Sequence, residues 1–244
     1  MQRLSIIVLA VLVFAAVLLW HLPAGWVLPE LAPELTCASV AGTLWNGYCA
    51  GAHVRGVALD QLTWQVHPWA LLRGQLSARL AAVRGTAAAS GEVSVSWHGP
   101  LRARDLRARL DLEPALLPIL PPYITGTLEA DIARLKVARD GAVERLQGRL
   151  TVRHLIDSSG EVTPLGSFAV TFPDSPGEPI GRLRDLGGPL ALTGTLRLTG
   201  QPGYVLRARV AARAGAAPSL LQALQYLGAP DAEGRRPFAL AGTY

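Results

Sequence analysis

The feature that most constrains the fold of this chain is a strict alternation of apolar and charged residues, clearest in LRARLDLE at residues 106–113. Every even position in this segment is apolar and every odd position is charged. A helix would distribute the apolar side chains around its circumference, whereas a β-strand gathers them on one face. The segment is therefore predicted to be a strand with one buried face, ended by Pro114.

The same period of two recurs along most of the chain. Alternating segments occur at 57–66, 76–82, 93–97, 128–135, 146–152, 168–172, 190–198, 205–213 and 238–244. Short connections between them favour an antiparallel meander. A slip in the alternation at Arg134 and Leu135 predicts a β-bulge. The predicted helices are short: a turn that Pro68 opens and Gly74 closes, a second near residues 115–123, and one over 219–227.

The predicted fold class is therefore mainly β, with a few short helices. A sheet with one apolar face must cover that face, by curling into a barrel or half-pipe, by packing on a second sheet, or by carrying helices. Because the helices are short, an antiparallel sheet that curls or forms two layers is expected. Whether it closes or leaves a groove stays open at this stage.

The N-terminus predicts a membrane anchor. Residues 4–20 are apolar except for Ser5, and a run of this length is near the lower limit for a spanning helix. No small-residue cleavage site follows, and Arg3 favours a cytoplasmic N-terminus. The predicted organisation is a cytoplasmic stub and transmembrane anchor at 1–22, a Pro-rich tether at 23–36, and a periplasmic β domain at 37–244. Pro23 to Pro33 is expected to form neither regular helix nor sheet.

The chain has two cysteines, Cys37 and Cys49. In an oxidising compartment a pair this close would form a disulfide that stabilises the fold by about 3 kcal/mol. Two reduced, buried thiols are the alternative. A metal site is not expected, because there is no Cys-x-x-Cys and no histidine at ligand spacing.

The net charge of +5 comes almost entirely from arginine, with Lys136 the single lysine. Basic residues form no runs and do not alternate with aromatic residues, so nucleic-acid binding is not expected. The arginines of the strands around Leu106 and Leu206 have two interpretations. They form a basic stripe that faces anionic headgroups or an acidic partner, or they keep one sheet face solvated and discourage edge pairing.

Little in the sequence points to catalysis. The five histidines are scattered, and there is no nucleophile elbow, phosphate loop or dinucleotide fingerprint. We therefore predict no catalytic residues, no cofactor and no metal. Trp45, Trp64 and Trp69 fall close together and form either a docking patch for lipid or protein, or the packing between the sheet and its first helix. The second interpretation is favoured.

Several of these segments together resemble the type II secretion system protein N family. The resemblance rests on GTLWNG at residues 42–47, and on Gly42, Trp45, Gly47, Trp64, Pro68 and Gly74 in their order and spacing. It continues in Leu186 to Gly188, Gly194 to Leu196, Gly203-Tyr204, and Leu224 to Arg235. The middle, about 87–179, matches only in style, and the cysteine pair is not part of the family pattern.

The resemblance implies a bitopic inner-membrane protein of Gram-negative bacteria whose periplasmic part serves protein export across the outer membrane. The family has no established catalytic residues. The predicted function is thus a non-enzymatic assembly or scaffolding role, with other inner-membrane or periplasmic secretion components as partners. Chains of one-faced strands also resemble the periplasmic AsmA-like group, whose curled sheets are thought to hold acyl chains. The alternative is therefore a lipid-binding or lipid-transfer protein with an apolar groove.

Overall fold

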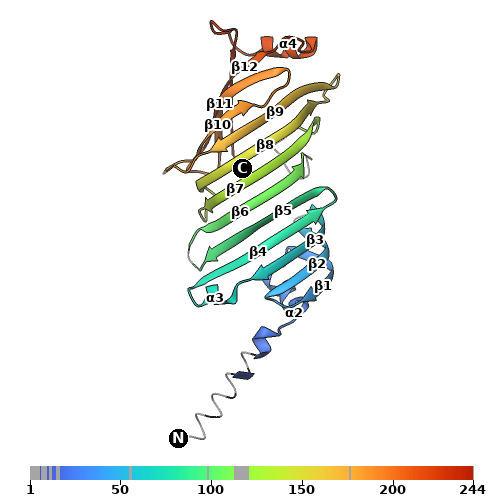
Figure 1. Ribbon diagram of the computed structural model, residues 1–244, viewed down its shortest axis with the longest axis vertical. Coiled ribbons are helices and arrows are strands. Elements are labelled where there is room, and N and C mark those ends of the chain that lie inside the picture. The colour runs from blue at the N-terminus through green and yellow to red at the C-terminus, as the bar shows by residue number, and fades with distance from the viewer. Residues whose placement is uncertain are drawn as a thin grey trace. The chain divides into compact units, whose positions relative to one another are not determined.

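The computed structural model describes residues 6, 10, 13–14, 17–54, 57–97, 99–112, 121–175 and 177–243. The chain divides into two units, Met1–Gly85 and Thr86–Tyr244, which are treated separately. In each unit the strands follow one another in sequence order and the described registers are antiparallel (Figure 1). The first and last described strands of each unit do not pair with each other, so neither sheet closes. The predicted antiparallel meander is confirmed.

The first unit is a small sheet covered by one helix. Its elements are α2 (Ala24–Leu31), β1 (Leu35–Gly42), β2 (Asn46–Val54), β3 (Val57–Val66), α3 (Pro68–Leu71) and β4 (Gln75–Arg84). The alternation in β3 places Leu62 and Trp64 on the same face of the strand, and both contact the same core cluster. Ala24 and Leu28 of α2 join that cluster, so the helix covers the apolar side of the sheet.

The prediction that Pro23 to Pro33 is irregular is wrong, because α2 occupies most of it and β1 begins at Leu35. Pro23 stands at the N-cap, but Pro29 lies inside the helix, where it removes one backbone hydrogen bond. Ala24 is only 1% exposed and Leu28 packs against the sheet. Burial of these side chains offsets the cost of the internal proline.

The predicted anchor at residues 4–20 falls largely outside the described residues. Residues 6, 10, 13–14 and 17–20 are helical and exposed. Among the residues described, none of the helices is both long enough and apolar enough to cross a bilayer. The anchor stays a prediction. Residues 115–120 of the second predicted helix, Glu113 at the end of the 106–113 strand, and Tyr244 also lie outside the described part of the chain.

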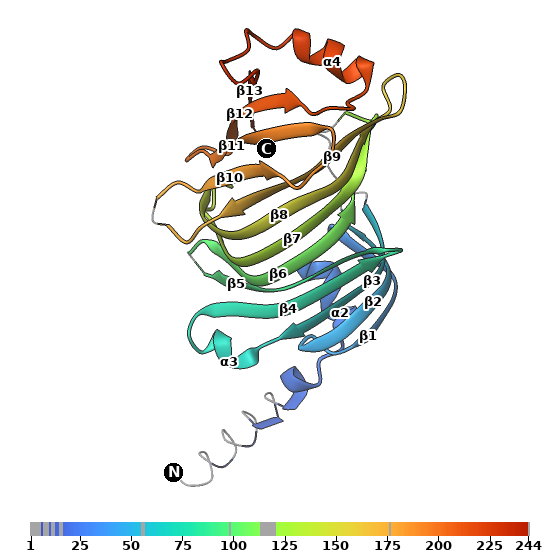
Figure 2. The same cartoon turned by 45° about the horizontal axis from the view of Figure 1, so that its top comes forward.

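The second unit is a larger sheet with one short helix. Its elements are β5 (Ala87–Ser96), β6 (Leu101–Asp111), β7 (Ile124–Val137), β8 (Val143–Asp157), β9 (Thr163–Phe172), β10 (Ile180–Asp185), β11 (Leu190–Leu198), β12 (Tyr204–Ala212), α4 (Pro218–Gln225) and β13 (Arg236–Gly242). The long strands β6 to β9 are visibly curved in Figure 2. The strand predicted from residue 106 is the second half of β6, and the helix predicted at 219–227 is α4.

The apolar face of the second unit packs largely on itself. Ile132, Leu146 and Phe172 are buried together, and Val170 of β9 and Leu196 of β11 pack against them. Strand β10 lies between β9 and β11 in the sheet. Gly181 of β10 is the register partner of Leu196, and a Cβ there would lie 2.5 Å from Val170 Cγ1 and 2.8 Å from the Phe172 ring. Because Gly181 has no side chain, side chains of β9 and β11 share a cluster across β10, and part of a face that no long helix in the described residues covers is buried.

The bulge predicted near Arg134 is confirmed. The register of β7 against β8 shifts between Ile132 and Arg134. Ile132 and Leu135 therefore both lie on the apolar side, facing Gly148 and Leu146, although they are three residues apart. A bulge adds one unpaired residue and reverses the phase of the side chains beyond it.

The turn between β10 and β11 is held by one partly buried carboxylate. Asp185, whose side chain is 13% exposed, accepts hydrogen bonds from Arg213 Nη2 at 2.5 Å and from the backbone N–H groups of Gly187 and Leu192, both at 3.2 Å. Burial acts to raise the pKa of this carboxyl, but the hydrogen bonds outweigh it and hold the pKa below its ordinary value.

Asp185→Asn is expected to lower the free energy of unfolding at neutral pH by about 2 kcal/mol, since it removes charge-assisted hydrogen bonds. The pKa of Asp185 is lower in the folded chain than in the unfolded chain. Its contribution is therefore complete above the unfolded-state value, about 3.9, and is lost as the pH falls through the folded-state value. Urea unfolding at several pH values should show that the difference in unfolding free energy between wild type and variant decreases below about pH 4. Asp174→Asn, at an exposed ion pair, should cost less than about 1 kcal/mol.

Candidate functional site

The segment Gly42–Gly47 forms a tight turn between β1 and β2. Gly42 and Gly47 are register partners at its base. The N–H of Thr43 donates to the carbonyl oxygen of Asn46 at 2.8 Å, and the N–H of Asn46 donates to Thr43 Oγ1 at 3.2 Å. Gly42 has a φ of +96°, a backbone conformation that other residues rarely adopt. The turn therefore depends on glycine at its first position.

Trp64 of β3 supports the turn from the neighbouring strand. Its Nε1 donates to the carbonyl oxygens of Thr43 at 3.3 Å and Leu44 at 3.2 Å, and its side chain is buried at 8% exposure. Gly47 is the register partner of Trp64. A Cβ at Gly47 would lie 2.5 Å from Trp64 Cζ2 and 2.7 Å from the Ala41 carbonyl oxygen. Because glycine has no side chain, the indole ring of Trp64 can pack directly against Gly47.

Trp45 connects the same turn to the end of the N-terminal helical residues. Its Nε1 donates to the Leu19 carbonyl oxygen at 2.9 Å, and its ring stacks on Trp20 with centroids 6.3 Å apart. The N–H of Leu44 donates to the Leu22 carbonyl oxygen at 3.0 Å. On the other side, the Trp45 carbonyl accepts from the Val66 N–H at 2.7 Å. The turn is thus the junction between residues 19–22 and the sheet.

The other family-like residues lie farther along the chain and do not join this junction. Pro68 occupies the first turn of α3, and Gly74, with a φ of +67°, ends the connection to β4. Trp69 is 73% exposed. Of the tryptophans predicted to fill the core, Trp64 does so, Trp45 packs on Trp20, and Trp69 lies at the surface. The three do not form one docking patch.

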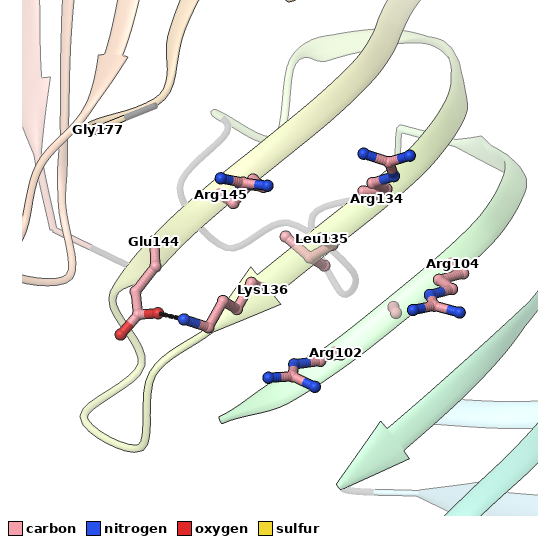
Figure 3. A pocket seen from close by; sticks show the side chains of 9 residues that line it. Arg102, Arg104, Arg134, Leu135, Lys136, Glu144, Arg145 and Gly177 are labelled. Atoms are coloured by element: carbon pink, nitrogen blue, oxygen red, sulfur yellow. Dashed lines mark ion pairs between the residues drawn. The ribbon is translucent and has the colours of Figure 1, made fainter. Parts of the chain in front are cut away.

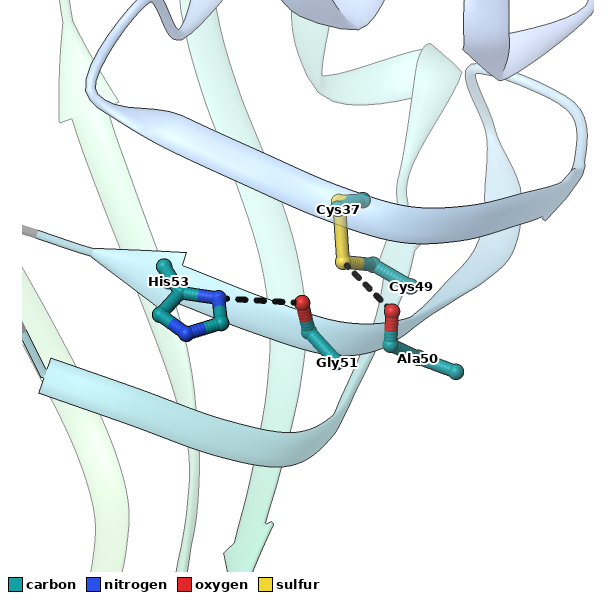
Figure 4. The surroundings of a disulfide bond; sticks show 5 residues. All are labelled: Cys37, Cys49, Ala50, Gly51 and His53. Carbon is teal, nitrogen blue, oxygen red and sulfur yellow. Dashed lines mark hydrogen bonds between the residues drawn. A yellow bond between two sulfur atoms is a disulfide. The ribbon is translucent and has the colours of Figure 1, made fainter.

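Cys37 of β1 and Cys49 of β2 are joined by a disulfide, with a Cα–Cα distance of 5.6 Å (Figure 4). Cys49 is fully buried in the first unit's core cluster. The covalent loop of sequence separation 12 encloses the Gly42–Gly47 turn. Among the residues described, no group of three metal-binding side chains comes together.

A second candidate site is a cationic pocket on the charged face of the second unit. The cavity has a volume of about 400 Å³. We call it the cationic pocket, and its lining is Arg102, Ala103 and Arg104 of β6, Arg134, Leu135 and Lys136 of β7, Glu144 and Arg145 of β8, and Gly177 (Figure 3). Five cations from adjacent strands thus line the cavity, together with one carboxylate, Glu144, which pairs with Lys136.

Sequence reasoning pointed to other arginines than those of the pocket. Arg107 and Arg109, from the clearest strand, stand opposite Asp131 and Glu129. The place of Arg102 in a cationic pocket could not be predicted from the sequence, because the residues near it do not show which strand lies beside it. The strand register supplies that information.

Gly47→Ala is expected to lower the free energy of unfolding by about 2 kcal/mol, because the added methyl group collides with the Trp64 ring and with backbone. Gly25→Ala is the matched control. It lies within α2 with open space around its Cβ position, so it should be neutral or stabilising. Equal urea midpoints for the two variants would contradict this role for Gly47.

Comparison with known proteins assigns the chain to a family. The model of the family described as "Type II secretion system (T2SS), protein N" matches residues 33–239, which include the turn, the disulfide and the cationic pocket. A type II secretion system protein N of Aeromonas hydrophila is 26% identical over 257 residues, covering 99% of this chain and 98% of the relative. One of Vibrio cholerae serotype O1 is 30% identical over 233 residues, covering 91% of both.

No solved structure matches the chain. The family match spans both units, and the aligned relatives agree with it over nearly their full lengths. The resemblance drawn from the sequence is confirmed: the chain belongs to the type II secretion system protein N family.

Proposed function

We propose that this protein is an accessory inner-membrane component of the type II secretion system, with a non-enzymatic role in assembly or scaffolding. The observation that carries the proposal is the family match over residues 33–239, together with relatives that align over 91% or more of their length. Its partners would be other inner-membrane or periplasmic secretion components, and its sheet would lie in the periplasm.

The junction at Gly42–Gly47 supports a positioning role. Residues 17–20 are helical, and the apolar side chains of Leu18, Leu19 and Trp20 are each more than half exposed. Trp45 and Leu44 hold the carbonyl groups of Leu19 and Leu22 against the first sheet. A domain attached in this way would be held close to a membrane in which residues 4–20 are anchored.

Deletion of the gene in a secreting strain is expected to leave type II exoproteins in the periplasm, because assembly of the apparatus would be impaired. Immunoblots of periplasm and medium measure this. The full-length gene should restore export. A form in which a cleavable signal peptide replaces residues 1–22 should not. Unchanged export in the deletion strain would rule out the proposed role.

The alternative, a lipid-binding protein, is supported by partial exposure of the apolar face in the second unit. Val95 and Leu101, register partners on that face, are 39% and 38% exposed, and Leu240 is 48% exposed. If this face holds acyl chains, the full-length protein should copurify with lipid in fixed stoichiometry. A Val95→Gln/Leu240→Gln variant should then lose that lipid. Mass spectrometry of lipid extracts that shows no difference between the two proteins favours scaffolding.

A further inference from the structure

We propose that the cationic pocket of β6, β7 and β8 binds an acidic, extended polypeptide segment of a partner protein. This interaction surface goes beyond the scaffolding role and does not depend on it, since it follows from the register, charges and contacts of the second unit alone. The cations of the pocket are not those of the basic stripe considered from the sequence, which lie in the strands around Leu106 and Leu206.

Like charges stand opposite one another across the strands of the pocket. Lys136 of β7 is in register with Arg102 of β6 on one side and with Arg145 of β8 on the other. Arg104 and Arg134 are also register partners. Directly opposite side chains have Cβ atoms about 5 Å apart, and like charges in that position destabilise a sheet. Fold stability alone does not explain this arrangement.

The same strands use complementary charges a few residues away. Arg107 stands opposite Asp131, and Asp131 stands opposite Arg149. Arg109 stands opposite Glu129, which also forms a 2.7 Å ion pair with Arg153. On these three strands, charges of opposite sign therefore face one another outside the pocket. Inside the pocket, by contrast, cations stand opposite cations.

Irregularities in two strands bring the cations to this face. In β7, the bulge after Ile132 reverses the side-chain phase. Arg134 and Lys136 therefore lie on the same polar face as their register partners in β6. In β6, Asp105 has a φ of +49°, and the register against β5 shifts opposite it. Positive φ is uncommon for residues other than glycine, and bulges often redirect side chains beside functional sites.

The pocket's own carboxylates leave it positively charged. Glu144 pairs with Lys136 at 2.5 Å, and Asp174 pairs with Arg134 at 3.2 Å. Glu92 of β5 is the register partner of Arg104. Counting these three carboxylates against the five lining cations leaves a formal charge of +2. Within the described part of the chain, Arg102 and Arg145 form no ion pair, and both are exposed.

The spacing of the cations fits an extended chain. Residues two apart along a strand, such as Arg102 and Arg104, are separated by about 6.6 Å. An extended acidic segment repeats its side chains on one face at the same distance. Arginine can bind each carboxylate with two parallel hydrogen bonds. A bilayer would instead present its phosphates in a plane, whereas these cations line a hollow.

The protein already carries an example of this contact. The connection between β9 and β10 contributes Gly177 to the lining of the pocket. From the same connection, Asp174 pairs with Arg134, and Glu178 lies 4.0 Å from Arg197. Carboxylates on a non-helical segment of polypeptide thus already meet cations of this face, and the remaining arginines of the pocket are left for a partner.

The test uses the full-length protein in a neutral detergent and a fluorescent peptide with aspartate at alternate positions. Arg102→Gln/Arg104→Gln/Arg145→Gln removes three of the five cations that line the pocket. Arg182→Gln/Arg184→Gln/Arg207→Gln is the matched control: it makes the same charge change on the same face, outside the pocket lining. Fluorescence anisotropy should show about 10-fold weaker binding for the pocket variant and less than about 3-fold for the control. Wild-type affinity should also fall between about 50 and 500 mM NaCl.

A stability measurement accompanies the binding assay and detects misfolding. Because opposed like charges are removed, the melting temperature of the pocket variant should rise by about 1–3 °C. A lower melting temperature would contradict the argument from the register. Equal peptide affinity for wild type and pocket variant, or an equal loss in the control variant, would overturn the proposal. The proposal would also be overturned if the wild-type protein did not bind the peptide but bound phosphatidylglycerol vesicles, because the pocket would then bind a membrane surface.

Discussion

The structure depends on one constraint: most strands have one apolar face, and that face must be removed from water. The two units meet the constraint differently. In the first, α2 lies over the sheet and completes a core around Trp64 and Cys49. In the second, side chains of β9 and β11 pack together across β10, over the position where Gly181 has no side chain. Neither solution needs a long helix, and neither closes the sheet.

The opposite face of the second sheet follows from the same alternation. Once the apolar residues of β6 to β8 turn inward, the intervening arginines must point outward. Opposite charges on β6, β7 and β8 then stabilise part of this face, as in the pairing of Arg107 with Asp131. The cationic pocket departs from that rule at Arg102, Lys136 and Arg145. Opposed like charges lower the stability of the sheet at the pocket. A ligand is therefore expected to supply the negative charges that the pocket lacks.

Sequence reasoning recovered what local patterns encode. The alternation identified β6, and the slip at Arg134 located the bulge in β7, because both depend on neighbouring residues along the chain. Helix α2 was missed because Pro29 argued against it, while the burial of Ala24 that stabilises it is a tertiary contact. The pocket could not be predicted for the same reason. Only the pairing of strands reveals that Arg102 faces Lys136.

The tryptophans show the same limit. Trp45, Trp64 and Trp69 are close in sequence, yet one supports the turn from within the core, one stacks on Trp20, and one is exposed. The glycines indicated the local structure better than the tryptophans did. Gly42 marks where the backbone turns, and Gly47 marks where the Trp64 ring fits. The conspicuous motif is therefore a structural junction, and the candidate binding surface lies in the second unit.

We propose that the cationic pocket binds an acidic partner, and the proposed function implies that this partner belongs to the secretion apparatus. The most direct measurement is photo-crosslinking in secreting cells, with a photoreactive residue in place of Arg104 and, for comparison, in place of Arg182. The account predicts an adduct from position 104 whose mass spectrum identifies another type II secretion component, through an acidic segment, and no such adduct from position 182. Adducts to phospholipid alone, or the same adducts from both positions, would contradict it.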